Sequence, residues 1–68
     1  MIVSVNGEPR ELPEDATVAS IATLMSIATE ARGVAVALDG VVVPRGQWGS
    51  TRLTDGALLE VVTAVQGG

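Results

Sequence analysis

Short apolar runs separated by turn signals make up most of the chain, a pattern typical of β-strands. Two hairpins are predicted, over residues 2–12 and 34–43. Their arms are joined by Asn6-Gly7 and Asp39-Gly40, dipeptides that suit a type I′ turn because both central residues of that turn need a positive φ.

A proline lies in the first hairpin, and another directly follows the second. Pro9 lies in the returning arm 8–12 together with three charged residues. Because proline has no N–H to donate to a neighbouring strand, this arm is predicted to be an edge strand. Pro44 closes the second hairpin, because it cannot continue a central strand.

One stretch of the chain has a helical period instead. Apolar residues recur at spacings of three and four; they are Val18, Ile21, Ala22, Met25 and Ala28. Thr17 suits the N-cap of this helix, and the acids before it suit the positive end of the helix dipole. Ile27 falls on the polar side of the pattern, so we expect the helix to end near Met25 or Ser26.

The last strand, predicted over 58–65, is the longest apolar strand candidate. Successive side chains of a strand point to opposite faces. The side chains predicted to face outward are those of Leu58, Glu60, Val62 and Ala64. Those predicted to face the core are Leu59, Val61 and Val65. A strand that is apolar on both faces is typical of the centre of a sheet.

The elements therefore follow the order hairpin, helix, hairpin, loop around Trp48, strand. One helix covers one face of a sheet, which gives an α+β two-layer fold with a four- to five-stranded mixed sheet. If the first and last strands are central neighbours, the helix connection between them makes them parallel. We expect a ubiquitin-like β-grasp domain over 1–65, followed by a flexible tail, 66–68.

Composition narrows the possible chemistry. The 68 residues contain no cysteine, histidine or lysine, and their formal net charge is −4. Thiol and histidine chemistry are thereby excluded, and we expect no catalytic residue, no metal site and no bound cofactor. The negative charge argues against nucleic acid and anionic membranes. No membrane span or targeting segment is predicted, so we expect a cytoplasmic protein.

The end of the chain, Gln66-Gly67-Gly68, is the one segment with candidate chemistry. Two glycines without Cβ atoms can enter a narrow channel in another protein and approach its active site. By itself a terminal Gly-Gly is a weak signal, because most such ends are simple tails.

The chain that ends in this tail resembles the ThiS family, the ubiquitin-like sulfur carriers of thiamin biosynthesis. The resemblance spans nearly the whole chain. Its most specific parts are Val43-Pro44-Arg45, Trp48 and the terminal Gly-Gly. Two positions depart from the family pattern: Asp39, where Asn is frequent, and Ala57, where an acid commonly follows Asp-Gly.

The resemblance implies a carrier rather than an enzyme. Gly68 would be adenylated with ATP by a ThiF-like adenylyltransferase and converted to a thiocarboxylate with sulfur from a cysteine desulfurase system. A thiazole synthase (ThiG-like) would then receive the sulfur. Gln66 and Gly67 would enter the partner, and the free carrier is expected to be monomeric.

Several residues outside the tail are candidates for a partner interface. Leu58, Val62 and Ala64 form a possible apolar patch on the sheet face where ubiquitin-like proteins commonly meet activating enzymes. Arg45 and Trp48 are further candidates, although a lone arginine is usually solvated and a lone loop tryptophan usually packs over a sheet edge.

Three other functions stay open. A MoaD-like carrier for molybdopterin synthesis would use the same Gly68 chemistry, but such relatives tend to be longer and to have a proline before the Gly-Gly. A protein modifier would form isopeptide bonds through Gly68. A binding-only module is the third, although the acidic charge is unfavourable for an RNA-contacting domain.

Overall fold

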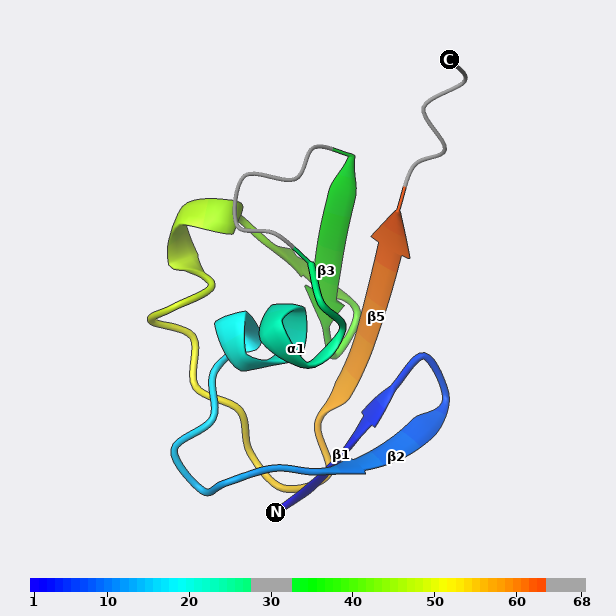
Figure 1. Ribbon diagram of the computed structural model, residues 1–68, viewed down its shortest axis with the longest axis vertical. Helices are drawn as coiled ribbons and strands as arrows, with labels where there is room; N and C mark the ends of the chain where they lie inside the picture. The colour runs from blue at the N-terminus through cyan, green and yellow to red at the C-terminus, as the bar shows by residue number, and fades with distance from the viewer. Residues whose placement is uncertain (28–32, 64–68) are drawn as a thin grey trace.

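A computed structural model describes residues 1–27 and 33–63 of the chain. In this part, five strands form one sheet in the order β2-β1-β5-β3-β4. The elements along the chain are β1 (Ile2–Val5), β2 (Glu8–Glu11), α1 (Val18–Leu24), β3 (Val34–Leu38), β4 (Val41–Val43), the 3₁₀ turn η1 (Arg45–Gln47) and β5 (Leu58–Thr63). Figure 1 shows α1 packed on one side of this sheet.

Both predicted hairpins are confirmed. Asn6 and Gly7 have φ values of 51° and 85°, and Asp39 and Gly40 have 49° and 87°, as a type I′ turn requires. β2 is an edge strand, as Pro9 predicted, and it ends at Glu11, one residue earlier than expected.

The last strand lies at the centre of the sheet, also as predicted. β5 runs parallel to β1, with Ser4 opposite Leu58 and Val5 opposite Leu59. It runs antiparallel to β3, with which it is paired from Leu59 to Thr63. The expected β-grasp arrangement of a mixed sheet on one helix is therefore present, with five strands. Residues 64 and 65 of the predicted strand lie outside the described residues.

The core lies between α1 and the sheet. Val18 and Ile21 of the helix are fully buried, as is Val36 of β3, and Leu59 of β5 is 1% exposed. Leu59 and Val61 point inward, as the alternation predicted. Because the helix covers one face only, the opposite face of the sheet is not covered by any described element.

The helix α1 ends at Leu24 with Met25 as its C-cap, close to the end predicted near Met25 or Ser26, but the burial of Met25 differs from the expectation. Met25 was predicted to lie on the buried face but is 39% exposed. Ile27, whose misfit to the helical pattern predicted that the helix ends before it, packs against the core beyond that end. The reason is Ser26, whose φ of 58° is left-handed. The Ser26 N–H donates to the Thr23 carbonyl (3.0 Å) and the Ile27 N–H to the Ala22 carbonyl (2.8 Å). This Schellman motif ends the helix and turns Ile27 inward.

The long connection 44–57 holds the start of the helix. The first-turn N–H groups of Val18 and Ala19 donate to the carbonyls of Thr51 (3.0 Å) and Trp48 (3.1 Å). Thr17 is the N-cap, as predicted, with extended backbone, and its N–H donates to Ser20 Oγ (3.0 Å). The first N–H groups of a helix have no acceptor within the helix, and this loop provides acceptors for two of them.

Candidate functional site

The predicted tail lies beyond the described residues, but its starting point is well defined. β5 ends at Thr63, and five more residues lead to Gly68. An extended chain of five residues spans at most about 18 Å. Any active site that acts on Gly68 must therefore lie within that distance of the end of the central strand. Gln66, Gly67, Gly68 and the interface candidate Ala64 all belong to this undescribed end.

The outer face is the face of the sheet opposite α1. Because side chains alternate along a strand, Leu58, Glu60 and Val62 of β5 all point to this face. Leu58 is 59% exposed and Val62 is 60% exposed, and Glu60 is exposed as well. Neighbouring strands add further exposed apolar side chains, namely Ile2, Ala35 and Val42. The candidate patch Leu58–Val62 is thus part of a larger apolar surface.

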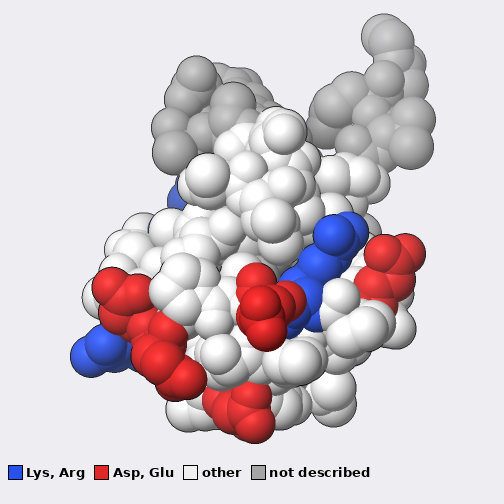
Figure 2. Space-filling model, turned by 60° about the horizontal axis from the view of Figure 1, so that its bottom comes forward, with Lys and Arg blue, Asp and Glu red and all other residues white. Residues whose placement is uncertain are grey.

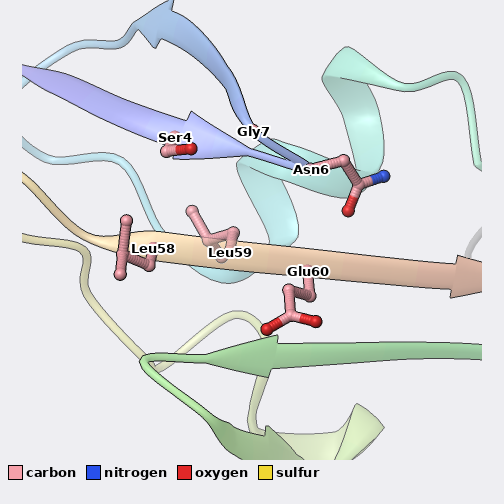
Figure 3. A pocket seen from close by; sticks show the side chains of 6 residues that line it. All are labelled: Ser4, Asn6, Gly7, Leu58, Leu59 and Glu60. Atoms are coloured by element: carbon pink, nitrogen blue, oxygen red, sulfur yellow. The ribbon is translucent and has the colours of Figure 1, made fainter.

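A hollow of about 400 Å³ opens on this face between β1 and β5. It is lined by Ser4, Asn6, Gly7, Leu58, Leu59 and Glu60. Figure 3 shows these residues along the two strands, with the Glu60 side chain leaning toward β3. The hollow combines an apolar wall with polar atoms of Ser4, Asn6 and Glu60, which suits the side chain of a partner better than a buried ligand.

Asn6 holds the two strands together at the end of the hollow. Its Oδ1 accepts the Val61 N–H (2.8 Å), and its Nδ2 donates to the Val61 carbonyl (3.2 Å). The Asn6 N–H also donates to the Leu59 carbonyl (2.9 Å). The side chain thereby continues the β1–β5 ladder after β1 has ended. The sequence indicated Asn6 only as a turn residue, because nothing local predicts a partner 55 positions away.

The other two interface candidates lie together after β4. Trp48 is 6% exposed, and its Nε1 donates to the Val43 carbonyl (3.0 Å), so its ring belongs to the core, as expected of a structural loop tryptophan. Arg45 is exposed, and its guanidinium carbon lies 4.6 Å from the centre of the Trp48 ring. This cation–π contact places the guanidinium over the ring of the buried tryptophan.

Within 1–27 and 33–63, no cluster of three or more potential ligands could bind a metal ion. Acidic side chains on the face shown in Figure 2 form separate groups, some of them beside a basic side chain, rather than one continuous acidic patch. No helix in the described part of the chain is long and apolar enough to cross a membrane.

Comparisons with known proteins agree with this geometry. The model of the ThiS family matches residues 3–68. A crystal structure of a thiamine biosynthesis protein (ThiS) from Geobacter metallireducens superposes with a TM-score of 0.79 at 30% identity, with all of both chains covered. A solution structure of a thiamine biosynthesis protein from the same organism gives the same TM-score and identity and is covered to 88%. No curated protein matches the sequence.

Proposed function

Since the chain belongs to the ThiS family, we propose that it carries sulfur for thiamine biosynthesis on the carboxyl group of Gly68. The observation that supports this proposal most directly is the extent of the family match, which runs through Gln66, Gly67 and Gly68. The central position of β5 adds to it, because a strand held on both sides is a rigid base for a short tail.

The proposed chemistry begins with an unreactive group. An ionised carboxylate is a poor electrophile, so Gly68 must be activated before sulfur can attack its carbon. A ThiF-like adenylyltransferase joins the carboxylate to AMP from ATP and releases pyrophosphate. The terminal sulfur of a persulfide, supplied by a cysteine desulfurase system, then displaces AMP and forms an acyl disulfide. A thiol of the sulfur-supplying enzymes attacks the other sulfur of this disulfide, which leaves a protein disulfide and releases the thiocarboxylate. The resulting thiocarboxylate donates its sulfur to a ThiG-like thiazole synthase.

In this scheme the chain itself acts as a co-substrate. Gln66 and Gly67 enter the channel of the partner, and at Gly67 and Gly68 a side chain larger than hydrogen would meet its walls. The folded part provides the docking surface and sets the reach of the tail. The carrier binds no cofactor, and ATP belongs to the activating enzyme.

The test is to co-express the full chain with a ThiF-like enzyme and a desulfurase, treat the product with a thiol-alkylating reagent, and measure its intact mass. The chain has no cysteine, so an adduct mapped to Gly68 reports a thiocarboxylate. Deletion of Gly68 serves as the control and is expected to abolish the adduct. Absence of labelling with an enzyme set that is active on another carrier would contradict the proposal.

The pathway is tested by the next step. The thiocarboxylated protein is expected to support thiazole formation by a thiazole synthase, and the unmodified protein is not. If the adduct forms but no thiazole is produced by an active synthase, the sulfur is destined for another acceptor, and the thiamine part of the proposal is wrong.

A further inference from the structure

Glu60 occupies an unusual position for a carboxylate. It lies on the central strand, between Leu58 and Val62, whose side chains are 59% and 60% exposed on the same face. Glutamate is disfavoured in strands, where β-branched and aromatic residues pack better on the pleated surface. The fold gains nothing visible from this carboxylate, because no ion pair of Glu60 occurs among the described residues.

The neighbouring strands leave Glu60 uncovered. On one side its partner in register is Ala37 of β3, whose methyl group is too short to cover a carboxylate. On the other side the register between β1 and β5 ends at Val5 opposite Leu59, one residue before Glu60. The chain turns away there at Asn6, and the hollow of about 400 Å³ opens beside Glu60.

On the outer face, the charged side chains of the described strands are all acidic. From the register, the charged strand residues that point to this face are Glu11, opposite Ile2, and Glu60. Arg10 pairs with the buried Val3 and therefore points to the other face. Among the described strand residues, the outer face thus presents two carboxylates on an apolar background and no cation. Such a face is complementary to an apolar surface that carries a positive charge.

We infer that Glu60 pairs with an arginine or lysine side chain of the ThiF-like enzyme that activates Gly68, on the outer face next to the hollow, and that this pair determines the specificity of that docking. The inference rests on the proposed function for the identity of the partner. Leu58 and Val62, on either side of Glu60, contact the apolar side chains of the partner that surround this cation. Once the face is covered, the lower dielectric strengthens the ion pair, and a partner without a cation would leave the carboxylate buried and unpaired.

The position of Glu60 fits a partner that works on the tail. A strand rises about 3.3 Å per residue, so Glu60 lies about 10 Å before Thr63 on β5. The tail beyond Thr63 reaches about 18 Å at most. An enzyme with Gly68 in its active site therefore lies close enough to rest on the outer face, and the same strand connects the docking surface to the reactive end.

The test compares two variants that remove one negative charge each. Glu60→Gln keeps the shape of the side chain, and Asp15→Asn removes an exposed acid from the loop before α1. These two variants and Glu60→Lys, which reverses the charge, are titrated beside the unaltered chain against the ThiF-like enzyme by calorimetry at several salt concentrations. We expect Glu60→Gln to weaken binding about tenfold or more and to reduce its salt dependence, Glu60→Lys to weaken it further, and Asp15→Asn to change it less than about twofold.

Equal binding by Glu60→Gln and Asp15→Asn would overturn the inference, as would a failure of the unaltered chain to bind. Circular dichroism of each variant verifies that the fold is intact. The mass measurement on Gly68 separates the two proposals. Glu60-dependent binding without a sulfur adduct supports the docking inference and contradicts the sulfur-carrier function. An adduct together with Glu60-independent binding supports the sulfur-carrier function and contradicts the docking inference.

Discussion

Three short polar residues at turns use their side chains as substitutes for backbone. The Asn6 amide bonds to both polar backbone groups of Val61. Asp39 Oδ1 accepts the Leu58 N–H (2.9 Å), and Asp55 Oδ1 accepts the Ile2 N–H (2.7 Å). Each bond joins a turn to a strand distant in sequence, so these residues hold the sheet together where its ladders end.

Asn6 has two roles: it adopts a positive φ in the turn, and its amide bonds to Val61. Two substitutions separate these roles. Asn6→Gly keeps a residue that tolerates positive φ but loses the amide, and we expect the free energy of unfolding to fall by about 1–2 kcal/mol. Asn6→Ala also places a Cβ in the left-handed region and is expected to cost about 1 kcal/mol more. Urea unfolding followed by the fluorescence of the buried Trp48 measures both. If Asn6→Gly is as stable as the unaltered chain, the Val61 bonds contribute nothing.

At the scale of elements, the helix end shows how one residue redirects a segment. The left-handed Ser26 closes the Schellman motif and brings Ile27 against the core, while Met25 stays exposed. Glycine is the usual residue at this position, because it adopts the left-handed region without strain. Serine thus maintains the motif at a cost in stability.

We therefore expect Ser26→Gly to raise the free energy of unfolding by about 0.5–1 kcal/mol. Ser26→Ala, which keeps the Cβ, is the control and should give no gain. The same urea titration measures both variants. A gain of equal size with alanine would mean that loss of the hydroxyl, rather than relief of the backbone, stabilises the chain.

The elements that local sequence determines were predicted well. The hairpin turns, the edge position of β2, the Thr17 cap and the alternation of β5 all follow from residues that are adjacent or a few positions apart. The misfit of Ile27 predicted the end of α1 correctly, but Met25 was wrongly placed on the buried face, because the helical pattern was extended to it and a serine carries no strong signal for a left-handed turn. The apolar outer face was predicted from alternation, but the isolation of Glu60 depends on Ala37 and on where β1 ends, which local patterns do not reveal.

At the scale of the whole molecule, the fold combines a covered and an uncovered sheet face. The uncovered outer face exposes Leu58, Val62 and Val42, with Glu60 among them. A charge within an exposed apolar surface also opposes association with further copies of the chain. The position therefore has a second physical effect, independent of any partner.

Glu60→Val joins Leu58 and Val62 into one apolar row, and we expect this variant to self-associate as its concentration rises. Sedimentation velocity over a range of concentrations measures the effect. Glu60→Gln, which stays polar, is the control and is expected to sediment as the unaltered chain does. Unchanged sedimentation of Glu60→Val would show that the outer face does not need the charge for solubility.

The pairing of the first strand with the last has a consequence for protein synthesis. β1 leaves the ribosome early but must wait for β5, because their ladder joins residues as far apart as Asn6 and Val61. Contacts of such long sequence separation form slowly. A chain released before Leu58 lacks the central strand and has no complete sheet. Interrupted translation thus yields a polypeptide open to proteases, rather than a folded but truncated domain.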